Sequence, residues 1–153
     1  MYIEEEVGRK TTTVNVSDWE NAYKEVKHLL ESRFKFDRVE EEKFRHHVER
    51  GLIISKINCY IEVDDFSYKE VTLVLNITKD EAEGKSATVT VDSKGEVVTN
   101  YSNENGKRSV WYYAFRSIYD KFIYGQARGK WKEDTAELVR EVHSELRGSL
   151  KNL

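Results

Sequence analysis

The most constraining feature of this sequence is a series of segments in which apolar and polar residues alternate. The longest covers residues 52–64 and puts its apolar side chains at Ile53, Ile57, Cys59, Ile61 and Val63. Residues 70–78 repeat the pattern, and Asp64-Asp65 suits a turn between the two segments. Because successive strand side chains point to opposite faces, this pattern predicts a long hairpin with one buried face.

Shorter segments extend the same pattern on both sides of this hairpin. Residues 86–92 and 96–101 alternate, with a turn expected at residues 93–95, and residues 10–16 alternate near the N-terminus, after a bend or bulge expected at Gly8. The short connections predict an antiparallel meander. Residues 35–50 are ambiguous, because 40–43 suit a helix while Phe44, His46 and Val48 alternate. We expect this segment to be extended.

Three helices are expected around this sheet. Ser17 and Glu20 have the spacing of a capping box, and the apolar residues that follow have helical spacing, which predicts a helix over 17–34. A segment rich in aromatic residues predicts a second helix over 110–124, stopped by Gly125. Residues 125–134 are expected to be a linker or tight turn, and a last helix is expected over 132–151.

These elements predict a single α+β domain over residues 1–153. A curved antiparallel sheet of about five to six strands would have the first helix and the two C-terminal helices packed on one face. This element order resembles the helix-grip, START-like arrangement, which implies a cavity between the sheet and a long C-terminal helix. The segment FDRVEEEKF, followed by GLIISKINCYIEVDDFSYKEVTLVL, also resembles uncharacterised small archaeal proteins. That second resemblance implies no function and no site residues.

The charge and the cysteine content indicate which kinds of partner and which cellular location to expect. The net charge is -3, which is too close to zero to indicate a polyanionic partner for the whole molecule. Residues 1–100 carry a net charge of -6 and residues 101–153 one of +3. The single cysteine, Cys59, excludes an internal disulfide and favours a cytoplasmic location. The acidic N-terminus predicts no signal peptide, and the sequence contains no apolar run of about 18 residues.

Motifs that identify large enzyme classes are absent from the sequence. It contains no GxGxxG, P-loop, CxxC, HExxH or GxSxG pattern. His46 and His47 are adjacent, so on a strand they point to opposite faces and cannot bind one metal ion together. Cys59 lies on an apolar face, where a thiol stays protonated and inert. Carboxylates at 40–42 and 64–65 suit a solvated face and a turn. We therefore predict no metal, no cofactor and no catalytic residue.

The segment 107–132 is the best candidate for a binding surface, because cations there flank many aromatic side chains. Most of the aromatic residues fall on one helical face and are expected to belong to the core. The cations with the flanking rings suit single-stranded nucleic acid, or a protein partner. The candidate binding residues are Arg108, Trp111, Tyr112, Tyr113, Arg116, Lys121, Arg128, Lys130 and Trp131.

The last helix offers a second possible interface. Residues 135–153 carry an apolar seam with a spacing near 3.5 residues, which packs either on the protein's own sheet or on a second copy in a homodimer. We expect a non-enzymatic binding module, with an apolar ligand between sheet and helices or a protein partner on the helices. The alternatives are nucleic-acid binding through 107–132 and, third, an enzyme that uses a helix-grip cavity, with Tyr60, Tyr101 and Tyr113 as candidate inward groups.

Overall fold

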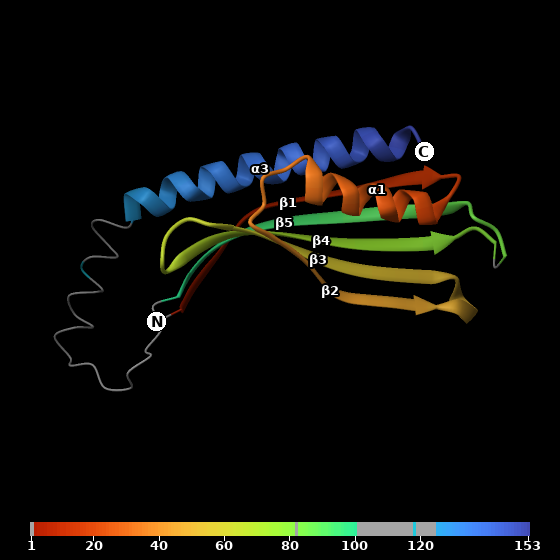
Figure 1. The fold of residues 1–153 in the computed structure, drawn as a ribbon, viewed down its shortest axis with the longest axis horizontal. Coiled ribbons are helices and arrows are strands. Elements are labelled where there is room, and N and C mark those ends of the chain that lie inside the picture. Colours follow the sequence, from red (N-terminus) through yellow and green to blue (C-terminus); the bar gives the residue numbers. More distant parts are fainter. Residues whose placement is uncertain (1, 82, 101–117, 119–124) are drawn as a thin grey trace.

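The computed structural model describes residues 2–81, 83–100, 118 and 125–153, and they form an α+β fold (Figure 1). The elements follow in the order β1 (Tyr2–Val16), α1 (Trp19–Ser32), β2 (Arg38–His47), the 3-10 turn η1 (Val48–Arg50), β3 (Leu52–Glu62), β4 (Ser67–Lys79), β5 (Ala87–Asn100) and α3 (Gly125–Lys151). The five strands make one antiparallel sheet in the order β1-β5-β4-β3-β2. The predicted antiparallel α+β sheet is therefore confirmed.

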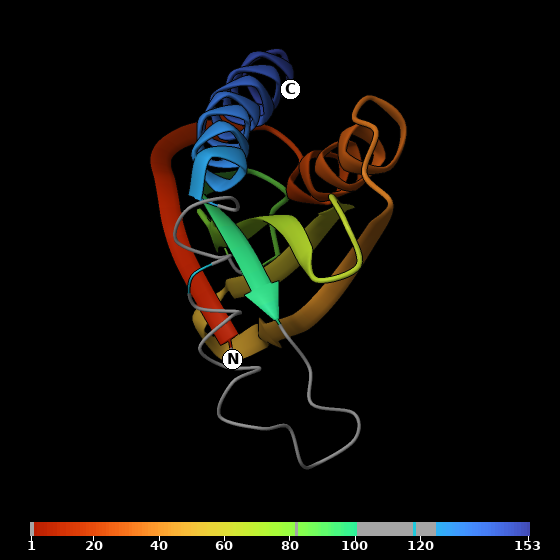
Figure 2. The same cartoon turned by 90° about the vertical axis from the view of Figure 1, so that its left-hand side faces the viewer.

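Both helices lie on the same face of the sheet (Figures 1 and 2). The alternation read from the sequence decides which side chains face them. Ile57 pairs with Leu73 across β3 and β4, and Leu75 pairs with Val91 across β4 and β5, and all four side chains are buried. From the helical side, Leu30 of α1 and the apolar residues of α3 complete this core. A continuous cluster of buried, mostly aliphatic side chains thus lies between the sheet and the described helices.

Helix α1 confirms the predicted first helix but begins at a different cap. The sequence pattern predicts Ser17 as the N-cap. In the structure Asp18 takes this place, because its Oδ1 accepts hydrogen bonds from the backbone N–H of Glu20 at 3.0 Å and of Asn21 at 3.3 Å. The Ser17 hydroxyl instead donates to the carbonyl oxygen of Leu153 at 2.6 Å. Either residue type can cap a helix, so the sequence alone did not decide between them.

The expected extended conformation of residues 35–50 is confirmed for residues 38–47. β2 covers 38–47, and a 3-10 turn then leads to Gly51, whose φ of 59° is in the left-handed region that suits glycine. The expected irregularity near Gly8 is also present, because the register of β1 against β5 shifts between Glu6 and Gly8.

Two sequence predictions about turns are wrong. Residues 93–95 make no turn, because β5 runs without a break from Ala87 to Asn100. Ser93 and Gly95 are small because they face α3, where Thr135 and Val139 pack close to the strand. Residues 125–134 are not a linker, because α3 covers Gly125–Lys151 and Gly125 itself is helical. Most residues of this stretch favour a helix, and Gly129 is exposed.

The predicted aromatic helix over 110–124 lies outside the described residues, apart from Ile118, which is exposed. Neither of the described helices has the length and apolar character that crossing a membrane requires.

Candidate functional site

The sequence-predicted surface 107–132 is described only at its C-terminal end, in the first turns of α3. Arg128 is buried, and its Nη2 donates to Thr99 Oγ1 at 3.4 Å, which ties the helix to β5. Lys130 is exposed, and Trp131 is half-buried, with its carbonyl oxygen accepting from Thr135 Oγ1 at 2.6 Å. The other candidates lie outside the described residues: Arg108, Trp111, Tyr112, Tyr113, Arg116 and Lys121.

The apolar seam of the last helix packs inside the protein. Thr135, Val139, Val142 and Leu146 are each at most 1% exposed. They lie in α3, which runs along β1 and β5. The part of the seam that would have to meet a second copy is therefore already covered by the chain's own sheet.

The most elaborate polar arrangement lies on the opposite face of the sheet, which the described helices leave uncovered. Because neighbouring strands are in register, side chains on this face form rows that cross the sheet. One row contains Tyr60, Glu70, Glu96 and Glu6, since each residue pairs with the next across β3, β4, β5 and β1. We call the three carboxylates of this row, Glu6, Glu70 and Glu96, the acid row.

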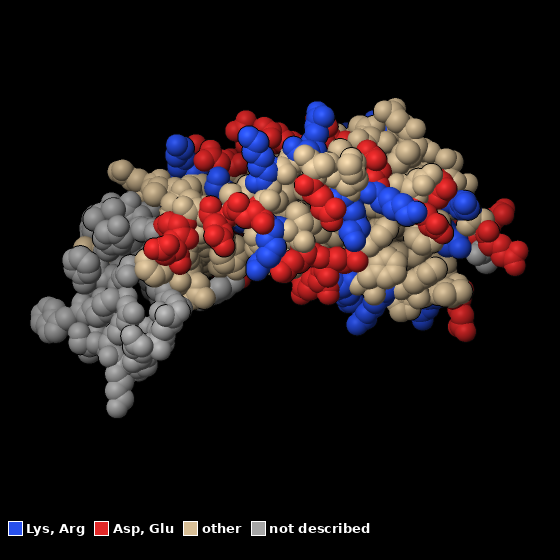
Figure 3. Space-filling model, in the orientation of Figure 1, with Lys and Arg blue, Asp and Glu red and all other residues tan. Residues whose placement is uncertain are grey.

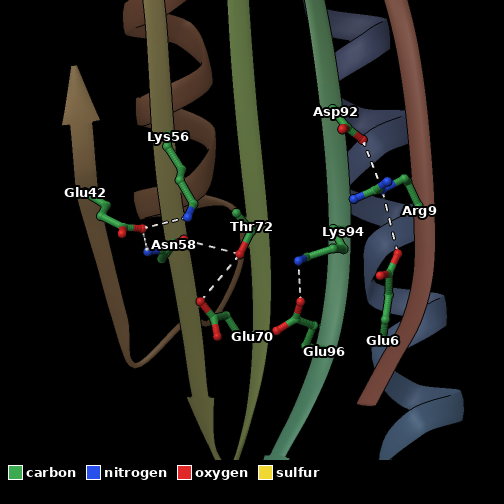
Figure 4. A network of polar contacts seen from close by, with 10 residues as sticks. All are labelled: Glu6, Arg9, Glu42, Lys56, Asn58, Glu70, Thr72, Asp92, Lys94 and Glu96. Atoms are coloured by element: carbon green, nitrogen blue, oxygen red, sulfur yellow. Dashed lines mark hydrogen bonds and ion pairs between the residues drawn. The ribbon is translucent and has the colours of Figure 1, made fainter. Parts of the chain in front are cut away.

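The row beside the acid row is neutral and basic, and it contains Asn58, Thr72, Lys94 and Arg9. Asn58 and Thr72 are nearly buried, at 6% and 7% exposed, although they lie on this open face. Thr72 Oγ1 donates to Asn58 Oδ1 at 3.2 Å and contacts Glu70 Oε1 at 3.4 Å. Figure 4 shows that these side chains connect the two rows.

Further groups of charged side chains make contacts toward both edges of the sheet (Figure 4). At the β2 side, Glu42 Oε2 accepts from Asn58 Nδ2 at 2.7 Å and lies 3.0 Å from Lys56 Nζ. At the β1 side, Arg9 Nε lies 3.7 Å from Glu6 and 3.8 Å from Asp92. Between them, Lys94 pairs with Glu96 on β5. Among the described residues, the acid row thus has cations along one side only, in the neighbouring row.

The carboxylates in the middle of this face hold protons more tightly than usual. Burial raises the pKa of Glu96, and a hydrogen bond with the Glu4 carboxyl raises it further, against the opposing effect of Lys94. The pKa of Glu70 is also raised, mainly by burial. A hydrogen bond between two carboxyl groups needs a proton on one of them, which is why the contact with Glu4 favours the protonated form of Glu96. In contrast, Asn58 and Lys56 lower the pKa of the exposed Glu42.

Tyrosine rings border the same face. Tyr60 and Tyr68 contact each other edge to face, with ring centroids 5.7 Å apart, and the guanidinium carbon of Arg38 lies 4.4 Å from the Tyr60 ring centroid. The side chains enclose an open depression of about 760 Å³, lined among others by Glu4, Tyr60, Tyr68, Glu70 and Glu96. A depression of this kind, with carboxylates beside aromatic rings, suits a cation.

Other titratable groups have structural roles in the part of the chain that is described. Cys59 is buried as expected, and this burial raises its thiol pKa to about 12. Tyr23 donates to Glu41, and burial next to that carboxylate raises the Tyr23 pKa. Asp64 Oδ1 accepts from the backbone N–H of Phe66 and Ser67 and so closes the β3–β4 turn.

The two histidines at the end of β2 do not act as a pair. The ring of His46 contacts Trp19 edge to face, with centroids 5.7 Å apart, and His47 points to the other face. The described residues contain no group of three histidine, cysteine, aspartate or glutamate side chains placed to hold a metal ion.

Sequence reasoning missed the polar face. The alternation in residues 52–64 puts Lys56, Asn58 and Tyr60 on the strand face opposite the apolar one, as the structure has them, but it does not align that face with the neighbouring strands. Acidic and basic side chains are interspersed on the face of the molecule that Figure 3 shows. The strand register alone would have been enough to find the acid row.

No family model matches this sequence, and no curated protein matches it. Among solved structures, an uncharacterised protein from Rhizobium leguminosarum is similar with 9% sequence identity and a TM-score of 0.22. The similarity covers 92% of this chain and 98% of that one. A TM-score this low carries no argument about fold or function.

Proposed function

We propose that this protein is a non-enzymatic binding module and that its polar sheet face binds a basic segment of a protein partner. The observation that carries this proposal is the acid row. Glu70, Glu96 and Glu6 occupy adjacent strands, which are about 4.8 Å apart. The three carboxylates are therefore regularly spaced acidic groups that can bind cations. Lysine or arginine side chains of a bound segment would supply counter-charge from above the face.

The protonation of the face supports a cation as the ligand. Burial, and then the nearby Glu4 carboxyl, raise the pKa of both Glu70 and Glu96, and a proton on either group removes its negative charge. A bound ammonium or guanidinium group would have the same electrostatic effect. Binding should therefore release protons and strengthen as the pH rises above the usual glutamate range.

The tyrosines give the face a way to hold the apolar part of such a segment. Arg38 already lies against the Tyr60 ring, which shows that this ring can accept a guanidinium group. Tyr68, half-buried beside it, offers a second ring at the same end of the depression. Carboxylates for the charge and rings for the side-chain stem match the chemistry of lysine and arginine.

Titration of a tetralysine peptide by calorimetry tests this proposal. Measurement in two buffers with different ionisation enthalpies should show proton release on binding, and affinity should fall with added salt. The double variant Glu70→Gln/Glu96→Gln removes two of the three row carboxylates, and we expect it to lose most of the binding. Glu31→Gln/Glu133→Gln is the matched control, because it makes the same charge change on the exposed sides of the helices.

Equal loss of binding in both double variants would show that net charge alone attracts the peptide, and the proposal would then be wrong. A single-stranded RNA that binds more tightly than the peptide, and is unaffected by Glu70→Gln/Glu96→Gln, would instead favour the basic segment 107–132.

A further inference from the structure

Strand β2 forms one edge of the sheet and is the most exposed strand in the described structure. It pairs with β3 on one side only, and every residue from Arg38 to His47 except Val39 is exposed. Figures 1 and 2 show β2 at the border of the sheet. The unpaired backbone N–H and C=O groups of an edge strand can pair with a strand from another chain.

From residue 40 onward the charges along β2 are divided, with the acidic residues first and the basic residues after them; Arg38 at the start of the strand precedes both groups. Residues 40–42 are all glutamates, and Lys43, Arg45 and the two histidines follow them. Such a strand is complementary to itself when it pairs antiparallel with a second copy. A two-fold axis between Glu42 and Lys43 sets Glu42 opposite Lys43 of the second copy and Glu40 opposite Arg45 of the second copy. Each of these pairs occurs twice in the dimer, because the interface is isologous.

In this register, the side chains that stand opposite each other lie on the same face of the sheet. Glu40 pairs with Asn58 and Arg45 with Ile54 on β3, so both side chains lie on the polar face. On the other face, Glu41 and Phe44 would stand opposite each other. This match depends on the irregularity in β2 between Glu41 and Lys43, which places Glu42 and Lys43 on the same face. Without that extra residue, the opposed charges would point to opposite sides of the sheet.

Exposed hydrophobic side chains on and next to β2 also favour an interface at this strand. Phe44 is 46% exposed and Val48, just after β2, is 72% exposed; both are large hydrophobic side chains. One face of the Phe44 ring already packs on Tyr23 of α1, with centroids 5.4 Å apart. A strand paired along β2 would cover the remaining side of this ring.

We propose that two copies of this protein form a dimer by antiparallel pairing of their β2 strands, which joins the two sheets into one continuous sheet. The complementary partner is the same strand in a second copy, because the acidic and basic halves are on one strand and match only in antiparallel orientation. This proposal is independent of the ligand on the polar face. It uses the strand edge, whereas the acid row lies on β1, β4 and β5.

Sedimentation velocity over a range of protein concentrations tests the dimer with charge-reversed variants. Glu40→Lys places a lysine opposite Arg45, and Arg45→Glu places a glutamate opposite Glu40. Because each contact occurs twice, either variant should raise the dimer dissociation constant about tenfold or more. The exchange variant Glu40→Lys/Arg45→Glu restores the opposite-charge pairs and should dimerise like the wild type. Both side chains are exposed, and circular dichroism checks that the fold is kept.

Mixing the two single variants gives the sharpest result. The Glu40→Lys chain is basic at both positions and the Arg45→Glu chain is acidic at both, so a heterodimer should form where neither variant dimerises alone. A wild type that stays monomeric at all concentrations would overturn the proposal. So would a dimer that is equally stable in both single variants, which would place the interface elsewhere. Misfolding cannot imitate the expected pattern, because it gives no rescue on mixing.

Discussion

The contact between α3 and β5 at Gly95 makes the strongest stability prediction. A Cβ atom at position 95 would lie 2.5 Å from Cγ2 of Val139 and 3.0 Å from Cγ2 of Thr135. Carbon atoms in contact are normally about 3.5–4.0 Å apart, so Gly95→Ala requires a displacement of about 1 Å. Val139 is β-branched and has essentially one favoured rotamer in a helix, so the helix itself must move. We expect a loss of about 1–3 kcal/mol in the free energy of unfolding.

Urea denaturation followed by far-UV circular dichroism measures this loss, and a second substitution tests its cause. Val139→Ala removes the clashing methyl group and alone should cost roughly 2 kcal/mol. If the clash is the reason for the effect, the double variant should be clearly more stable than the sum of the single effects indicates. An unchanged stability in Gly95→Ala, or strict additivity in the double variant, would refute the reasoning.

Gly148→Ala is the control, because it makes the same substitution at a helix position where no neighbouring side chain lies close. Gly148 lies in α3, and apart from its own stretch of the helix no atom lies within 4 Å of the added Cβ. Alanine favours a helix over glycine, so this variant should gain about 0.5–1 kcal/mol.

The remaining predictions concern three other residues. Because the folded-state pKa of Glu96 is raised, the folded protein binds its proton more tightly than the unfolded chain, and stability falls as the pH rises above the usual glutamate value. Glu96→Gln should reduce this fall in urea titrations between about pH 4 and 7, and an unchanged slope would contradict it. Asp18→Ala should cost about 1 kcal/mol through the lost cap of α1, while Asp18→Asn should keep most of the stability; equal loss in both would assign the effect to charge. Cys59, with a pKa of about 12, should not react with a thiol reagent at about pH 8 until urea unfolds the protein, and rapid labelling of the native protein would show that it is accessible.

Much of the sheet could be predicted because side-chain alternation has the same period as a strand. Ile53, Leu73 and Val91 were identified as inward-facing from the sequence, and each is fully buried. Helix α1 could be predicted for the corresponding reason, because its apolar residues recur with the period of a helix. These patterns report on one element at a time and need no knowledge of its neighbours.

The wrong predictions arise where tertiary contacts determine the residue type. Ser93 and Gly95 read as a turn because small polar residues are typical of turns. In the structure they are small because α3 lies directly on them, and no local pattern carries that information. Residues 125–134, with two glycines, likewise read as a linker or tight turn, although the packing of α3 outweighs the low helix propensity of glycine there.

The polar face was missed for a related reason. Glu70 and Glu96 are far apart in sequence and each looks like an ordinary solvated strand residue. Only the register between β4 and β5 makes them neighbours, and burial raises their pKa values. The self-complementary charges of β2 are different, because the halves 40–42 and 43–47 are visible in the sequence. Their significance depends on knowing that β2 is an edge.

The position of β1 in the sheet has a consequence for the order of folding. β2 to β5 form a meander in which every strand pairs with its sequence neighbour, so these strands can assemble through short loop closures. β1 instead pairs with β5, joining Val16 to Ala87 and Tyr2 to Asn100. The first of these strands to leave the ribosome must therefore wait until the fifth has been made. Pairings between distant segments form slowly, so we expect the closure of β1 onto β5 to limit the folding rate.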